Sequence, residues 1–168
     1  MLFFAVNVSA QQISTADLQV TGLTCSMCSN ATQKSLETLN FIDAVKPDLN
    51  KNIFVLTFKK GANINLDMVR KKVQDAGFSV GGLTADFTFN QVKVDENGQA
   101  VADGNVYRFV NAKNKVLNGK VKASIVDKNF VSGSAFKKQA ATVNSDAYAS
   151  GTAVVNGKKI RVYHLVLS

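Results

Sequence analysis

Several residue types are scarce in this sequence, and each scarcity argues against a class of protein. No apolar run is long enough to span a bilayer, which argues against a transmembrane helix. Histidine occurs once, at His164, and cysteine twice, so the chain is short of ligands for a tetrahedral zinc site. Low-complexity tracts and charge runs are also absent, so we expect a globular protein of one or two domains.

The two cysteines stand together and form the candidate metal site. Cys25 and Cys28 lie three positions apart, between a run typical of a strand and a run typical of a helix. Thiolates are the softest ligands in proteins, so such a pair can close on one metal ion. The start of a helix supplies unpaired N–H groups and a positive dipole end, which both favour the thiolate.

The first half of the chain alternates between patterns typical of strands and of helices. Leu66, Val69 and Val73 recur at helical spacing, and Gly77 stands where a helix-ending glycine belongs. We expect strands at 18–23, 41–45, 53–58 and 78–80, and helices at 28–40 and 66–76. This βαββαβ order is that of the ferredoxin-like fold.

Two short motifs carry a resemblance to a known family. The string Gly22-Leu23-Thr24-Cys25-Ser26-Met27-Cys28 is similar to Gly-Met-Thr-Cys-x-x-Cys, and Ala76-Gly77-Phe78 is similar to an Ala-Gly-aromatic string that closes the second helix. Residues 17–83 therefore resemble a heavy-metal-associated (HMA) domain, the module of copper chaperones, metal-transporting ATPase tails and the periplasmic mercury-binding protein. The chain departs from the family at Leu23, Thr32, Ser35 and Asn40-Phe41. These departures weaken the expected stability of the domain more than its expected metal binding, because neither cysteine is changed.

The resemblance implies which residues support the cysteines and which ions they take. Thr24 and Ser26 would adjust the loop by hydrogen bonds, Met27 would point outward or lend a weak thioether, and Phe78 would wall the site from below. Zinc-selective family members tend to carry an acidic residue where Thr24 stands, which makes Zn(II) the least favoured ion. Two thiolates alone suit Cu(I), or Hg(II) as a toxic mimic.

The N-terminus has the pattern of a secretory signal. Residues 2–6 are apolar, and Val8-Ser9-Ala10 has the small-x-small form that signal peptidase cuts. We expect residues 1–10 to be a signal-peptide remnant and the protein to be periplasmic or secreted, with a short buried strand as the alternative reading.

The second half, residues 84–168, has the pattern of a β domain. Asn-Gly pairs at 97–98, 118–119 and 156–157 indicate hairpin turns. We expect strands at 86–94, 105–111, 119–127, 146–155 and 159–167, with one helix within 132–141. Five strands with a helix after the third is the order of an OB-like barrel, and a small sandwich is the alternative. We therefore expect an α+β chain with an HMA domain at 11–83 and a β domain at 84–168.

The second half offers little chemistry of its own. It contains no Cys, Met or Trp and no recognisable catalytic motif, so we expect a stability or docking module and no enzyme. Twelve Lys and Arg against six Asp and Glu give it a net charge of +6, which favours an acidic partner.

These observations predict an exported, monomeric Cu(I) carrier that exchanges its ion with a donor or acceptor protein, for example a metal-transporting membrane protein, and binds no nucleic acid. Two alternatives stay open at this point. The first is a periplasmic mercury scavenger, and the second is a thiol–disulfide redox protein. Thioredoxins carry an aromatic residue before the first cysteine and a facing cis-proline, whereas this chain has Thr24 there and its single proline, Pro47, in a turn.

Overall fold

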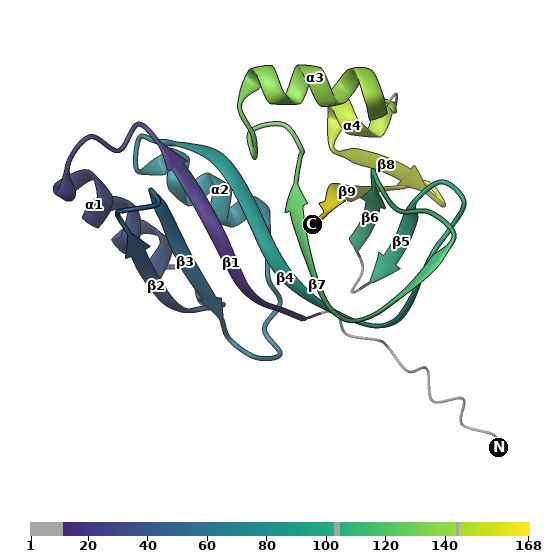
Figure 1. Cartoon of the computed structure of the whole chain (residues 1–168), viewed down its shortest axis with the longest axis horizontal. Coiled ribbons are helices and arrows are strands. Elements are labelled where there is room, and N and C mark those ends of the chain that lie inside the picture. The colour runs from purple at the N-terminus through teal and green to yellow at the C-terminus, as the bar shows by residue number, and fades with distance from the viewer. Residues whose placement is uncertain (1–11, 103–104, 144) are drawn as a thin grey trace.

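The structure is a computed structural model, and it describes residues 12–102, 105–143 and 145–168 (Figure 1). The expected signal-peptide remnant, residues 1–10, lies outside the described residues. Within the described ranges no helix is long and apolar enough to cross a membrane. One sheet runs through both halves of the described chain, in the strand order β2-β3-β1-β4-β7-β9-β6-β5, with β8 paired to β9.

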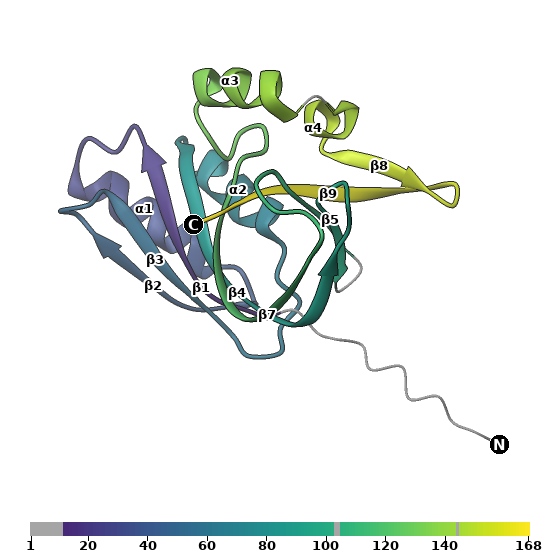
Figure 2. The ribbon, with the colours of Figure 1, turned by 45° about the vertical axis from the view of Figure 1, so that its right-hand side comes forward.

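The first half has the ferredoxin-like order of elements. These are β1 (Gln12–Thr21), α1 (Ser26–Glu37), β2 (Ile42–Asp48), β3 (Ile53–Phe58), α2 (Leu66–Asp75) and the start of β4 (Ser79–Val94). Helices α1 and α2 cover one face of the sheet (Figures 1 and 2). The layer between these helices and the sheet contains fully buried side chains, among them Leu18, Leu36, Leu56 and Val69. The predicted βαββαβ fold is therefore confirmed for this half.

Local sequence signals account for the ends of α2. The Asn65 side chain accepts a hydrogen bond from the Met68 N–H at 3.2 Å, which caps the start of the helix. Gly77 follows the last turn with a φ of 90°, a conformation that suits glycine.

The strand β4 is longer than the sequence pattern predicts. We expected two separate strands, at 78–80 and 86–94, but one strand of 16 residues runs from Ser79 to Val94 through Gly81 and Gly82. The glycines lie where the pairing with β1 shifts register, and a Cβ on Gly81 would lie 2.7 Å from Thr21 Cγ2. A side chain at Gly81 would therefore crowd Thr21 of the paired strand, and the chain makes no turn here.

The second half continues the sheet from β4. Its elements are β5 (Gln99–Ala102), β6 (Asn105–Phe109), β7 (Lys115–Ile125), α3 (Gly133–Val143), α4 (Asp146–Ser150), β8 (Thr152–Val155) and β9 (Lys158–Leu167). β4 pairs with β1 along one edge and with β7 along the other. β6 runs parallel to β9, and β5 also lies near β4, so the strands curl back on themselves (Figure 1). The choice between an OB-like barrel and a sandwich stays a prediction, as does the domain boundary, which falls inside β4.

Two further sequence expectations for this half are wrong. The predicted strand at 146–155 is the short helix α4 followed by β8. Asn118-Gly119 makes no hairpin but lies within β7, opposite an irregularity of β4 between Phe89 and Val92. In contrast, the pairs at 97–98 and 156–157 lie at turns, and α3 occupies the predicted helical segment.

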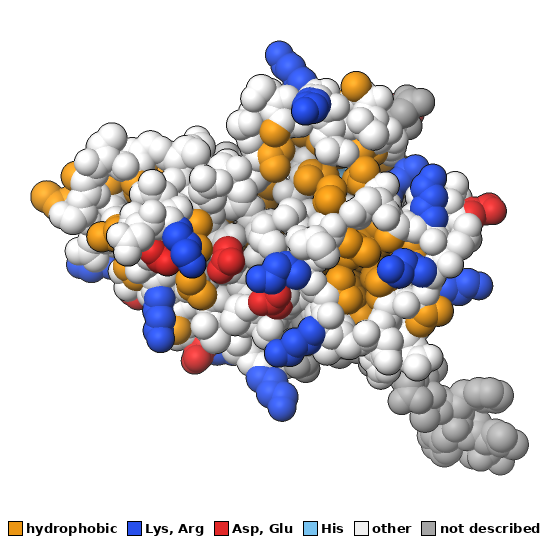
Figure 3. Space-filling view, in the orientation of Figure 1, with side chains coloured by type: hydrophobic (Ala, Val, Ile, Leu, Met, Phe, Trp, Pro, Cys, Tyr) orange, Lys and Arg blue, Asp and Glu red, His pale blue; other side chains and the backbone are white. Residues whose placement is uncertain are grey.

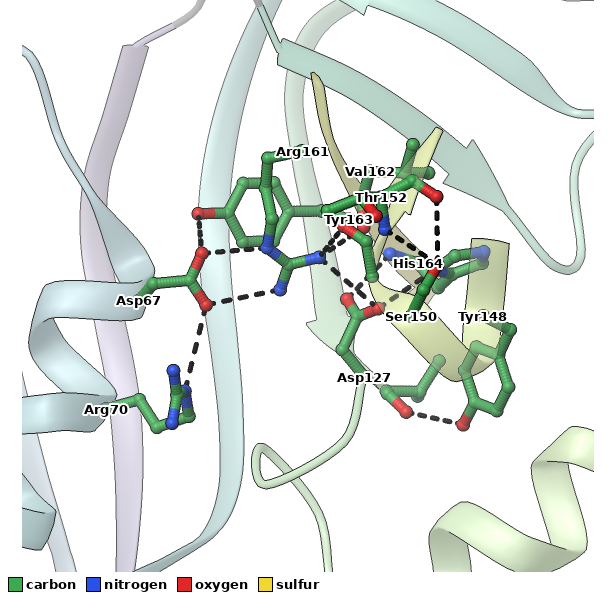
Figure 4. A network of polar contacts seen from close by, with 12 residues as sticks. Asp67, Arg70, Asp127, Tyr148, Ser150, Thr152, Arg161, Val162, Tyr163 and His164 are labelled. Atoms are coloured by element: carbon green, nitrogen blue, oxygen red, sulfur yellow. Dashed lines mark hydrogen bonds and ion pairs between the residues drawn. The ribbon is translucent and has the colours of Figure 1, made fainter. Parts of the chain in front are cut away.

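A polar network joins the two halves. Arg161 of β9 donates to both carboxylate oxygens of Asp67 at the start of α2, at 2.7 and 3.2 Å, and the Tyr163 hydroxyl donates to the same carboxylate at 3.0 Å (Figure 4). The Arg161 guanidinium also lies 4.1 Å from the centre of the Tyr163 ring. The network fixes α2 of the first half against β9 of the second.

Candidate metal centre

The loop between β1 and α1 positions the two cysteines. Gly22 follows the last residue of β1 and has a φ of 91°, a left-handed conformation that an L side chain rarely adopts. Cys25 then takes the N-cap position of α1 in an extended conformation. Its Sγ accepts a hydrogen bond from the Cys28 N–H at 3.3 Å, so the first cysteine serves as the helix cap that Ser or Asp usually provides.

The two thiols are free and adjacent. Their Sγ atoms lie 2.6 Å apart, with Cys25 exposed and Cys28 half-buried. The hydrogen bond with Cys25 is the main cause that lowers the pKa of the Cys28 thiol below its ordinary value. Desolvation opposes this change, and hydrogen bonds from the backbone and side chain of Thr24 add to it. The geometry thus favours the thiolate, which is the form that binds metals.

The predicted supporting residues surround the loop in different ways. Met27 points into solvent, with 81% of its surface exposed. Phe78 lies below the loop, 3.5 Å from the position that a Cβ on Gly22 would occupy. Ser26 is the first residue of α1 and lines a hollow beside Cys25. Their roles in metal binding stay predictions.

His164 lies in the second half, away from the cysteines in the fold. Its side chain is fully buried. Its backbone N–H donates to Asp127 Oδ2 at 2.8 Å, and its ring nitrogen Nδ1 lies 2.9 Å from Asp127 Oδ1 (Figure 4). Among the described residues, no three His, Cys, Asp or Glu side chains are grouped so as to hold a metal ion. Cys25 and Cys28 therefore stay the predicted metal ligands.

Sequence reasoning missed two features of the site. Thr32, noted only as a departure from the family, is fully buried and donates from its hydroxyl to the Cys28 carbonyl at 3.0 Å. The spacing of four residues on one helix is the signal that could have found this bond. The turn between β2 and β3 also lies beside Cys25 and contributes Asp48, Leu49 and Asn52 to the hollow. No local sequence pattern predicts the contact between this turn and Cys25, because the contact depends on how β2 and β3 pack against α1.

Comparison with known proteins identifies the part of the chain that carries this site. Residues 17–79 match the family model of the heavy-metal-associated domain. Residues 17–79 are an HMA domain. The match agrees with the resemblance seen over residues 17–83, and the cysteine pair lies inside it. None of the curated proteins compared with the chain matches it.

Several solved structures are similar to the HMA domain. The yeast copper transporter domain Ccc2a, in its apo and Cu(I)-loaded states, is 26% identical, and the comparison covers 39% of this chain and 88% of that one with a TM-score of 0.36. A copper-binding domain from the P-type ATPase HMA7 is 28% identical over 39% of this chain and 86% of its own, with a TM-score of 0.35. The putative copper-ion-binding protein of Bacillus anthracis strain Ames is also 28% identical, over 43% and 97%, with a TM-score of 0.35.

Proposed function

We propose that this protein is an exported Cu(I) carrier that binds one ion through the Cys25 and Cys28 thiolates. The supporting observation is the pair of free, neighbouring thiols at the exposed start of a helix, within the segment that matches the HMA family model. Two soft donors suit a d¹⁰ ion of low coordination number such as Cu(I). Zn(II) prefers four ligands and would have to recruit two more groups from elsewhere.

The same geometry supports transfer of the ion to a partner. Cys25 is exposed, so a thiolate of a donor or acceptor protein has room to add as a third ligand before Cys25 leaves. We assign the partner role to another metal-binding protein, for example a metal-transporting membrane protein. The net charge of +6 on residues 84–168 suits an acidic partner.

Native mass spectrometry of the reduced protein, with Cu(I), Zn(II) and Hg(II) offered together, tests the proposal. We expect one Cu(I) per chain and no stable Zn(II), because only two soft ligands are available. Cys25→Ser or Cys28→Ser should abolish tight binding, and the matched control His164→Ala should retain it where that variant folds.

Three outcomes would contradict the proposal. Tight Cu(I) binding by Cys28→Ser would show that Cys25 and Cys28 are not together the ligands of the ion. Preferential uptake of Hg(II) would favour the mercury scavenger. A protein that takes up no ion but forms a Cys25–Cys28 disulfide would favour a redox role.

Export is the second part of the proposal and rests on the apolar residues 2–6 ahead of Val8-Ser9-Ala10. We expect the protein isolated from its native host to begin at Gln11, because signal peptidase would cut after Ala10. N-terminal sequencing checks this, and a product that retains Met1 in the cytoplasm would contradict it.

A further inference from the structure

A hollow of about 220 Å³ lies directly beside Cys25, between the start of α1 and the turn that joins β2 to β3. We call it the Cys25 pocket. Its apolar lining comes from Leu23, Leu49, Ile53 and Phe54. An apolar cavity of about 150 Å³ is large enough to hold benzene, so this hollow has room for one large apolar side chain.

The turn that forms one wall of the pocket is held in place by its own hydrogen bonds. Asp48 Oδ1 accepts from the N–H groups of Asn50 at 3.1 Å and Lys51 at 3.2 Å, and the Lys51 ammonium lies 3.8 Å from Asp48 Oδ2. Asp48 is the one ionisable side chain in the lining besides Cys25, and its charge is already engaged within the turn. The wall that this turn forms is therefore preformed, and its one carboxylate is held within the turn.

Large apolar side chains are exposed around this site. Met27 has 81% of its surface exposed and Leu49 has 64%, although most large apolar residues in the described part of the chain are buried. The space-filling view shows hydrophobic side chains at the end of the molecule where α1 begins (Figure 3). Exposed apolar groups next to a pocket are typical of the centre of a protein–protein contact.

We propose that the Cys25 pocket receives a large apolar side chain, of the leucine or methionine kind, from the protein that exchanges metal with this one. This inference rests on the proposed function. The apolar part of the lining, made by Leu23, Leu49, Ile53 and Phe54, matches an apolar side chain, and the pocket borders Cys25 and not Cys28. A side chain seated there brings a neighbouring thiolate of the partner to the exposed Cys25.

The pocket thus sets the order of ligand exchange. The partner's thiol loses its proton and forms a new bond to the ion, and the bond from the ion to Cys25 then breaks. Cys25 takes up a proton as it leaves, and no electron is transferred. Cys28 is half-buried whereas Cys25 is exposed, so Cys28 is the last ligand to be released.

Two synthetic dipeptides test the proposal on the full-length, copper-loaded protein. One is N-acetyl-Leu-Cys-amide and the other is N-acetyl-Ser-Cys-amide, which carries a similar thiol without the apolar side chain. We expect the leucine peptide to remove Cu(I) about tenfold faster, because its side chain is buried during the exchange, and a factor of ten corresponds to about 1.4 kcal/mol.

Variants at exposed positions supply the controls. Leu49→Asp should abolish the difference between the two peptides, because it places a charge at the rim of the pocket. Leu49→Met should retain it. Val154→Asp introduces the same charge at an exposed valine of β8 and should retain it as well.

Equal rates for the two peptides, or a preference that survives Leu49→Asp, would overturn the inference. Failure of the proposed function gives a different result, since the protein would then hold no Cu(I) before any peptide is added.

Discussion

At the scale of single residues, Gly22 decides whether the cysteine loop can form. Its φ of 91° is strained for any L side chain, although a Cβ there would meet only ordinary contact with Phe78. We expect Gly22→Ala to lower the free energy of unfolding by about 1–2 kcal/mol. Gly133→Ala is the matched control, because Gly133 begins α3 with open space around it, and we expect a gain of about 0.5 kcal/mol. Urea unfolding measures both, and an unchanged midpoint for Gly22→Ala would contradict the expectation.

At the scale of elements, the contact between α2 and β9 should depend on pH through Asp67. Burial tends to raise the pKa of Asp67, but the hydrogen bonds and charge of Arg161, with help from Tyr163 and Arg70, outweigh it and lower the pKa below its usual value. A lowered carboxyl pKa stabilises the fold above the unfolded pKa of about 3.9, and this stabilisation is lost as the pH falls through the folded value. We expect Asp67→Asn to cost about 1–3 kcal/mol at pH 7 and progressively less below about pH 4.

Asp75→Asn is the control for that experiment, because Asp75 pairs with Lys71 at 2.8 Å on an exposed helix face. An exposed pair of this kind contributes about 0.5 kcal/mol or less. Thermal unfolding from pH 2.5 to 7 measures the loss of stability in both variants. Equal losses would show that the α2–β9 contact stabilises the protein no more than an exposed ion pair does.

At the scale of the whole molecule, the shared strand β4 should make the two halves unfold together. Buried residues of both halves form one continuous hydrophobic cluster. Phe87 and Phe89 of β4 pack edge-on against Tyr107 and Phe109 of β6, at 6.1 and 6.0 Å between ring centres. We expect calorimetry to show one transition whose calorimetric and van't Hoff enthalpies agree. Two separate transitions would contradict this.

The sequence predicted the parts of the fold that depend on local periodicity and short motifs. The βαββαβ order and the glycine after α2 follow from nearby residues, and the match to the HMA family confirms the first of these. The separate strands predicted at 78–80 and 86–94 are one strand, β4, because a glycine such as Gly81, which lies close to Thr21 of the paired strand, looks in a sequence like a glycine at a turn. The pocket beside Cys25 could not be predicted, because its walls come from two separate segments, residues 23–29 and 48–54, that meet only in the folded protein.

The single proline has a consequence for how the protein behaves in concentrated solution. We expected Pro47 in a turn, but it lies in β2, the outermost strand of the sheet on the HMA side, next to the exposed Lys46. An outer strand with free N–H groups is a template on which a second chain can add a strand, and such addition is a route to aggregates. Proline offers no N–H, and a lysine would have to lose its water, so neither favours strand addition. The sheet edge nearest to the free thiols, strand β2, thus disfavours the addition of a strand from a second copy of the protein.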